Sequence, residues 1–374
     1  MRTHILDTLL NFMDMKKLLF LFVFFQTYLF AQTQLSKGKI IVERINSPSL
    51  QNTGEEDNIR SVTIYLPPNY DQTTNRYPVI YFLHGFTESD SLMISPYRFD
   101  TLLDKAIISG LIRPVIVAMP NEYTLYRGSY YTNSSLTGNW ADFTAKDVVR
   151  YVDDHYRTMA NKDSRGITGF SMGGGGAIKL GMLFPDVFSV VYGSSPGPLA
   201  VVEELGATGE SFKRAQNIKT REELLKDVNF MANALVAMAR AYSPNPSKPP
   251  FYCDLPFTYK GDSLVTDYQT LDLWNKNMPF EMVDDYLGNL KKLQALKFDW
   301  GRNDEIAFII AGCKMFSEKL ENYGINHYAE EYIGTHGDKL LTDDGRELND
   351  VLPFFNRYLK FEELKFKKSQ DQKK

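Results

Sequence analysis

The stretch Gly169-Phe170-Ser171-Met172-Gly173 decides how the rest of the chain is interpreted. It matches the pattern G-x-S-x-G, in which a serine stands on a sharp turn between a strand and a helix and small neighbours let the two elements approach. The flanking sequence fits, because residues 167–169 predict a short strand and residues 173–184 a helix. A phosphate-binding loop is the alternative for the run of glycines, but the pattern G-x-x-x-x-G-K-S/T is absent. Ser171 is therefore the candidate nucleophile.

A serine hydroxyl becomes a strong nucleophile only when a base takes its proton. In chains with this turn the catalytic residues follow the order serine, acid, histidine, which leaves His327 and His336 among the five histidines. His336 lies in the loop 334–338, directly after a predicted strand, whereas His327 lies at the start of that strand. We predict His336 as the base and His327 as a surface or packing residue.

The acid that orients the histidine should also follow a strand, between the serine and the histidine in the chain. Asp304 follows the predicted strand 295–300 in the turn 301–304. Asp299 lies within that strand and is expected to make structural hydrogen bonds. Asp304 is therefore the predicted acid, and Asp299 the alternative.

Attack on a carbonyl creates an oxyanion, which backbone N–H groups can stabilise. We predict one donor at Met172, directly after the nucleophile, and a second in the loop after the strand 79–83. Phe86 is the preferred second donor and Thr87 the next. Thr87 is also a candidate for substrate binding, together with Tyr130 and Trp140 from the aromatic segment 123–140, although packing in the core is the alternative for these rings.

Short apolar runs alternate with amphipathic segments along most of the chain. Strands are predicted at residues 40–45, 61–66, 79–83, 115–119, 167–169, 188–192, 295–300 and 328–333, and helices at 99–109, 142–156, 173–184, 306–323 and 347–359. Several strands lack polar alternation, as expected when both faces of a parallel sheet are covered. The pattern predicts an α/β fold with a mainly parallel central sheet flanked by helices.

The alternation breaks between residues 199 and 293. This segment contains helical runs at 221–242 and 282–293 and a proline-rich loop at 243–250. We interpret it as a helical insertion that caps the active site; a separate small domain is the alternative. The insertion divides the core into residues 38–198 and 294–361, and residues 362–374 form a polar tail.

The N-terminal residues 1–31 resemble a leader. From Met15 the chain has two lysines, an apolar run at 18–30 and then Ala31 and Gln32, which is typical of a secretory signal. The apolar run is shorter than the ~20 residues of a membrane-spanning helix, so a membrane anchor is the less favoured interpretation. The residues before Met15 are interpreted as a misassigned start. We predict a periplasmic or secreted protein with no membrane span once the leader is removed.

Composition excludes several classes of function. The chain has 374 residues, 43 % hydrophobic and 24 % charged, with a net charge of −4, so it offers no basic surface for nucleic acid. Its two cysteines, Cys253 and Cys313, have no histidine at metal-ligand spacing, so no metal site is expected. Two buried free thiols are expected, with a disulfide as the alternative.

With these pieces placed, the chain resembles the esterase-D-like family. The similar stretches are residues 65–70, 77–85 and 169–185, together with the turn 301–304 and the loop 334–336. The family contains S-formylglutathione hydrolases, feruloyl and other carbohydrate esterases, ferric-enterobactin esterases and mycolyltransferases. The resemblance implies an α/β-hydrolase fold, a triad at Ser171, Asp304 and His336, and no metal or organic cofactor. The long insertion departs from the compact members of the family.

Together these inferences predict an exported serine carboxylic-ester hydrolase that works through an acyl-enzyme. The expected substrates are esters linked to carbohydrate or small aromatic esters. Two alternatives stay open: an acyltransferase that uses the same triad to load a sugar hydroxyl, and a binding protein that kept the fold without turnover. A product assay with an added acceptor would separate the first alternative from a hydrolase.

Overall fold

The computed structural model describes residues 37–207 and 209–362, and residues from Gly38 onward form one compact unit that includes the insertion. The predicted leader, residues 1–31, and residues 363–374 of the predicted tail lie outside the described residues. Within the described ranges, no helix combines the length and the apolar character needed to cross a bilayer.

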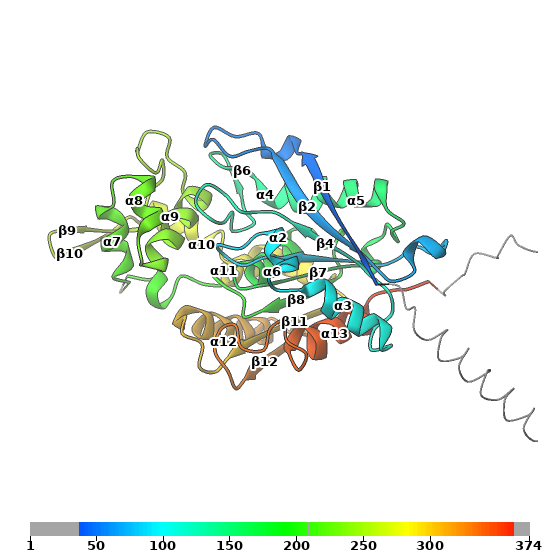
Figure 1. Ribbon diagram of the computed structural model, residues 1–374. Helices are drawn as coiled ribbons and strands as arrows, with labels where there is room; N and C mark the ends of the chain where they lie inside the picture. Colours follow the sequence, from blue (N-terminus) through cyan, green and yellow to red (C-terminus); the bar gives the residue numbers. More distant parts are fainter. Residues whose placement is uncertain (1–36, 208, 363–374) are drawn as a thin grey trace, which may run out of the picture. The chain divides into compact units, whose positions relative to one another are not determined.

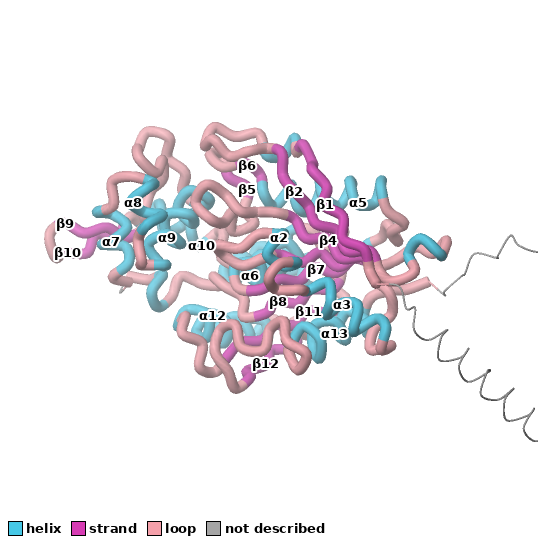
Figure 2. The backbone as a smooth tube through the Cα atoms, viewed as in Figure 1, coloured by secondary structure: helices cyan, strands magenta, loops and turns pink. Residues whose placement is uncertain are grey.

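A central sheet of eight strands organises the described part of the chain (Figures 1 and 2). From one edge to the other its strands are β1 (Lys39–Asn46), β2 (Ile59–Leu66), β4 (Ile116–Pro120), β3 (Val79–Leu83), β7 (Arg165–Phe170), β8 (Val190–Ser194), β11 (Ala295–Gly301) and β12 (Tyr328–Tyr332). The strands β1, β2 and β4 pair antiparallel, and every pair from β4 to β12 is parallel. The predicted α/β fold is confirmed.

Helices cover both faces of this sheet, which explains why its strands lack polar alternation. Along β3, Ile80 and Phe82 join the core cluster of one face, and Val79, Tyr81 and Leu83 join that of the other. The first face is covered by α3 (Phe99–Ile108) and α13 (Leu352–Tyr358), which lie side by side in Figure 1. The second face is covered by α5 (Val149–His155), α6 (Met172–Leu183), α11 (Pro279–Leu290) and α12 (Ala307–Asn322).

Short elements connect these layers. They are η1 (Pro48–Leu50), η2 (Tyr70–Gln72), α2 (Asp90–Ile94), β5 (Asn133–Ser134), β6 (Gly138–Asn139), α4 (Trp140–Asp142), η3 (Phe143–Val148), η4 (Lys162–Ser164) and η6 (Glu347–Val351). The predicted helix 142–156 is found as the continuous path α4, η3 and α5, with a π-helical turn at η3.

The insertion is more finely divided than predicted. The helical run expected at 221–242 forms two helices, α8 (Arg221–Lys226) and α9 (Phe230–Tyr242), because the Asn229 side chain accepts the Ala232 N–H and starts a new helix. The other elements here are η5 (Glu203–Leu205), α7 (Ser211–Asn217), α10 (Tyr268–Asn275) and the hairpin strands β9 (Phe257–Lys260) and β10 (Ser263–Thr266).

The end of the predicted insertion belongs to the layers of the core. Helix α11 begins at Pro279, three residues before the predicted start, and packs against α6 and α12 on one face of the sheet. It lies between the parallel strands β8 and β11 in the chain, so it is the crossover helix that a parallel connection requires.

Substitution of Gly173 is expected to destabilise the fold strongly. A Cβ at Gly173 would lie 2.0 Å from the Leu83 carbonyl oxygen, so β3 and α6 would have to separate. Gly173→Ala should lose about 3 kcal/mol or more of the free energy of unfolding, measured by chemical denaturation. The matched control is Gly288→Ala in α11, where a Cβ meets no atom within 4 Å and alanine should gain up to about 1 kcal/mol. Equal effects of the two substitutions would contradict the steric argument.

Candidate active site

Ser171 stands on the turn between β7 and α6 in a conformation that L-residues rarely adopt, with φ 57° and ψ −118°. Its N–H donates to the Ser194 carbonyl at 2.9 Å, and its own carbonyl accepts the N–H groups of Gly175 and Gly197 at 3.0 Å each. These backbone hydrogen bonds hold the strained turn, which leaves the hydroxyl at the C-terminal end of β7.

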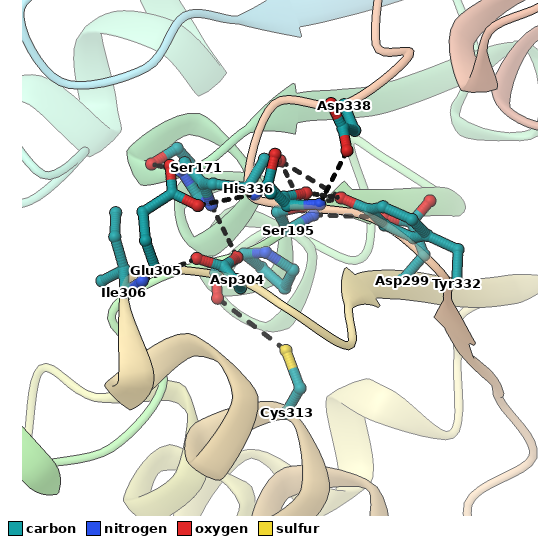
Figure 3. A network of polar contacts seen from close by, with 12 residues as sticks. Ser171, Ser195, Asp299, Asp304, Glu305, Ile306, Cys313, Tyr332, His336 and Asp338 are labelled. Atoms are coloured by element: carbon teal, nitrogen blue, oxygen red, sulfur yellow. Dashed lines mark hydrogen bonds and ion pairs between the residues drawn. The ribbon is translucent and has the colours of Figure 1, made fainter.

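His336 brings its imidazole to this hydroxyl from the loop that follows β12 (Figure 3). Its Nε2 lies 2.9 Å from Ser171 Oγ, and its Nδ1 lies 2.8 Å from Asp304 Oδ2. The ring is largely buried and packs on Phe170, with 4.7 Å between ring centroids. Because Nδ1–H donates to the carboxylate, Nε2 is free to accept the serine proton.

Asp304 follows β11 and is enclosed by protein. One carboxylate oxygen faces His336, and the other, Oδ1, accepts the Ile306 N–H at 2.9 Å. The structure therefore brings together Ser171, His336 and Asp304, the three residues that the sequence singles out.

Asp299 lies in a different network. Its carboxylate accepts hydrogen bonds from Arg346 Nη1 at 2.5 Å, the Tyr192 hydroxyl at 2.8 Å and the Ser195 N–H at 3.2 Å. Burial raises the pKa of Asp299, and the neighbouring Arg346 opposes that rise. These three partners of the carboxylate are structural groups, as expected from its position inside the strand.

The network around Asp299 also fixes the backbone of the loop that carries His336. The His336 carbonyl accepts hydrogen bonds from Ser195 Oγ at 3.1 Å, the Tyr332 hydroxyl at 3.2 Å and Arg346 Nη2 at 3.4 Å. The Arg346 guanidinium also lies over the Tyr332 ring at 4.2 Å. Arg346, Tyr332 and Ser195 were not predicted from the sequence. The available signal was Asp299 itself, because a carboxylate inside a buried strand requires a cationic partner.

The two backbone N–H groups predicted as oxyanion donors are unpaired in the described part of the chain, and the alternative donor is not. Among the described residues, the N–H groups of Met172 and Phe86 have no hydrogen-bond acceptor. The Thr87 N–H donates to the Arg127 carbonyl at 3.0 Å and is therefore already used. A Cβ on Gly128 would lie 2.6 Å from both the Met172 sulfur and the Phe86 ring. The absence of a side chain at Gly128 therefore allows its backbone to lie close to the side chains of Met172 and Phe86.

A buried histidine supports the loop that carries Phe86. His84 Nδ1–H donates to the Gly85 carbonyl at 2.9 Å, and His84 Nε2 accepts the Glu122 N–H at 2.9 Å. Burial lowers the pKa of His84 to about 4, so the ring is neutral at ordinary pH and can both donate and accept. The Tyr131 hydroxyl donates to the His84 carbonyl at 2.8 Å.

The aromatic candidates separate into two groups. Tyr130 stacks on the Phe86 ring at 5.8 Å, and Phe230 of α9 meets the same ring edge-on at 5.3 Å. Both therefore lie beside the loop 84–87, which carries the predicted oxyanion donor Phe86 and is called the oxyanion loop below. Trp140 is fully buried: its indole N–H donates to the Thr137 carbonyl, and its ring packs against Phe143. The prediction that Trp140 binds substrate is wrong, because the start of α4 places this ring in the core. The prediction rests only on the aromatic character of the residue.

The remaining histidine and cysteine candidates lie outside this arrangement. His327 contacts Ser317 Oγ at 2.8 Å and the Ile325 carbonyl at 2.9 Å. Both cysteines are free thiols; Cys313 is buried and Cys253 is half-buried. In the part of the chain that the structure describes, no three His, Cys, Asp or Glu side chains gather in a way that could hold a metal ion.

Glu122→Gln is expected to flatten the dependence of stability on pH. Burial raises the pKa of Glu122 from its ordinary value of 4.5 to about 8, against hydrogen bonds from Ser129 and Thr144. The stability linked to this proton is complete below pH 4.5 and is lost as the pH rises through 8. Glutamine does not titrate, so the slope of unfolding free energy against pH between 5 and 8 should be less negative by up to about 1.4 kcal/mol per pH unit.

Denaturation at several pH values measures this slope. The exposed Glu222→Gln is the control and should leave the slope of the wild type unchanged. Parallel slopes for Glu122→Gln and the wild type would contradict the assignment of a buried proton to Glu122.

Comparisons with known proteins agree with this geometry. The profile of the Esterase family, described as "Putative esterase", matches residues 55–340. A protein named esterase from Mycobacterium tuberculosis is 32 % identical over 151 residues, which cover 39 % of this chain and 30 % of that protein. An endo-1,4-beta-xylanase/feruloyl esterase from Xylanibacter ruminicola is 26 % identical over 206 residues, covering 49 % of this chain and 27 % of that protein. The chain thus matches less than a third of the length of these curated relatives.

Solved structures share the fold. A ferulic acid esterase superposes with a TM-score of 0.60 at 20 % identity, covering 86 % of this chain and 98 % of the other. An S-formylglutathione hydrolase from Staphylococcus aureus gives a TM-score of 0.54 at 16 % identity, covering 86 % and 100 %. At these identities the likeness shows the fold. The family match spans most of the sequence, including all three residues of the Ser171 site, and the chain therefore belongs to the Esterase family.

Proposed function

We propose that this member of the Esterase family is an exported carboxylic-ester hydrolase whose nucleophile is Ser171, with His336 as its base and Asp304 as the orienting acid. One observation carries the proposal: Ser171 Oγ, the His336 ring and the Asp304 carboxylate form an unbroken chain of hydrogen bonds of 2.9 and 2.8 Å. A serine, a base and a third group that orients the base are the parts that nucleophilic acyl transfer requires.

The first step forms the acyl-enzyme. His336 Nε2 accepts the proton of Ser171 Oγ while that oxygen attacks the ester carbonyl carbon. Asp304 keeps the proton of the ring on Nδ1 and stabilises the imidazolium that forms. The protonated His336 then gives its proton to the leaving alcohol oxygen as the bond between carbon and that oxygen breaks.

The N–H groups of Met172 and Phe86 donate to the carbonyl oxygen while it carries negative charge. The backbone at both residues is fixed before substrate binds. Met172 lies in the first turn of α6, and Phe86 lies in the loop that the His84 side chain supports. Donors that need no rearrangement stabilise the transition state more than the substrate.

The second step releases the acid. A water molecule takes the place of the alcohol and gives a proton to His336 Nε2 as its oxygen attacks the acyl carbon. The tetrahedral intermediate collapses, the bond to Ser171 Oγ breaks, and His336 returns the proton to that oxygen. Ser171 and His336 are then in their starting states.

The proposed substrates are esters linked to carbohydrate or small aromatic esters. The rings of Tyr130 and Phe230 lie against Phe86, beside a proposed oxyanion donor. Tyr130 is buried, whereas Phe230 is 45 % exposed and offers flat apolar surface for an aromatic acyl group. Similar proteins include one named xylanase/feruloyl esterase and a solved ferulic acid esterase.

The insertion is proposed to cap this site. Phe230 of α9 is 45 % exposed yet touches Phe86, and the Arg127 guanidinium donates to the Leu225 carbonyl of α8 at 2.6 Å. Both contacts join the insertion to segments that frame the oxyanion loop. The location outside the cytoplasm rests on the leader predicted at residues 1–31.

Release of p-nitrophenol from p-nitrophenyl acetate tests the nucleophile. Purified mature protein should turn over, and Ser171→Ala should fall by roughly 10⁴-fold or more in kcat, because the triad acts as a unit. Circular dichroism spectra of the two proteins should coincide, which separates lost chemistry from lost folding. Equal turnover by the two folded proteins would show that Ser171 is not the nucleophile.

The two buried aspartates should respond differently to the same change. Asp304→Asn is expected to reduce kcat by roughly 10³- to 10⁴-fold with the fold intact, because the imidazole loses the partner that orients it. Asp299→Asn leaves the Arg346 charge without its carboxylate and should lose roughly 3–5 kcal/mol of stability, while the folded fraction keeps kcat within about tenfold. Denaturation curves and kcat per folded molecule measure both effects. A greater loss of kcat in Asp299→Asn would reverse the assignment of the acid.

A further inference from the structure

A cavity of about 510 Å³ lies between the hydrolase core and the insertion. Gly54 and Tyr126 line it from the core, and Arg221, Arg240 and Tyr252 line it from the insertion. Its volume is in the range of sites for small ligands. None of the three proposed catalytic residues lines it, so the mechanism gives it no role.

Two guanidinium groups give this cavity a cationic lining. Arg240 is only 3 % exposed; it donates to the carbonyls of Phe251 at 2.8 Å and Gly54 at 3.2 Å, and its buried Nε has no partner among the described residues. Arg221, at the start of α8, is exposed. No ion pair of either arginine occurs within residues 37–207 and 209–362, but both guanidinium charges oppose the rise in the pKa of Glu56 that burial causes.

Acidic side chains near the cavity balance part of this charge. Glu55 lines the cavity and is exposed to solvent. Glu56 is buried, accepts the Leu125 N–H at 2.9 Å and does not line the cavity. The lining itself thus presents two guanidinium groups against one solvated carboxylate.

Flat side chains complete the cavity. The Arg240 guanidinium lies over the Tyr126 ring at 4.1 Å, which holds both groups in place. Tyr252 is 42 % exposed, and Pro246 and Pro250 also line the cavity. Aromatic and pyrrolidine rings offer flat surfaces against which the C–H faces of a sugar ring can pack.

We propose that this cavity binds a carboxylate-bearing sugar, such as a uronate unit of a saccharide. A guanidinium can donate two parallel hydrogen bonds to one carboxylate, and the exposed Arg221 lines the cavity. The exposed Tyr252 ring, with Pro246 and Pro250, contacts the body of the sugar, and the lining arginines contact its acid group. A simple inorganic anion would use the arginines but not the rings.

The segment 126–128 connects the cavity to the oxyanion loop. Tyr126 lines the cavity, the next residue, Arg127, accepts the Thr87 N–H, and Gly128 lies against Phe86 and Met172. A saccharide seated in the cavity would therefore lie beside the elements that position the ester. Its role as a substrate subsite rests on the proposed function, whereas the binding event does not.

Calorimetric titration of the Ser171→Ala protein tests the site without turnover. The two probes are xylotetraose and the same oligosaccharide carrying one glucuronate branch. The acidic probe should bind about tenfold or more tightly than the neutral one, since a charged hydrogen bond of about 1.5–3 kcal/mol corresponds to that ratio. Adding Arg221→Gln should remove most of this preference, and adding Tyr252→Ala should weaken both probes.

Lys226→Gln provides the matched control, because Lys226 lies on the same helix α8, is exposed, pairs with Glu222 and does not line the cavity. It should leave both affinities unchanged. Equal affinity for the two probes, or a loss of affinity in Lys226→Gln as large as in Arg221→Gln, would overturn the proposal. Binding of inorganic phosphate without binding of the acidic oligosaccharide would also overturn it. If the acidic probe binds but the wild-type protein hydrolyses no ester, the result would support the binding site and refute the proposed function.

Discussion

The close approach of backbone at Gly173 is the constraint on which the site depends. This residue and Gly169 lie so near the Leu83 carbonyl that neither has room for a side chain. With the first turn of α6 pressed against the ends of β3 and β7, the chain must reverse within one residue, and Ser171 takes up the resulting strain. The loop that carries Phe86 follows β3 directly, so the same contact sets the distance between Ser171 and the proposed oxyanion donors.

Much of the architecture was predictable because its signals are local. The strand β3 was predicted to the residue, and β11 and α12 to within one residue at each end, since apolar runs bounded by turn residues define them. The hairpin β9–β10 was missed although Gly261 and Asp262 mark its turn, because its strands are only half-buried and carry a weak apolar pattern. The crossover helix α11 was assigned to the insertion because a single sequence does not show against which layer an amphipathic helix packs.

The candidate site divides in the same way. Ser171, Asp304 and His336 are identifiable because each follows a predicted strand, and parallel strands end at one edge of a sheet. The roles of the three residues remain predictions. The supports of the site were not accessible in the same manner: Arg346 reaches Asp299 and the His336 carbonyl through contacts that join three separate segments. Trp140 shows the opposite error, since aromatic character alone does not distinguish a binding surface from a core.

The position of Arg346 in the chain has a consequence for biosynthesis. The loop that presents His336 is held by a side chain ten residues further on, and helix α13, which covers one face of the sheet, follows directly. A nascent chain that already contains the serine turn and most of the sheet therefore still lacks a positioned base. The proposed reaction therefore requires synthesis to continue past Arg346, and incomplete products that end before this arginine are expected to be inert.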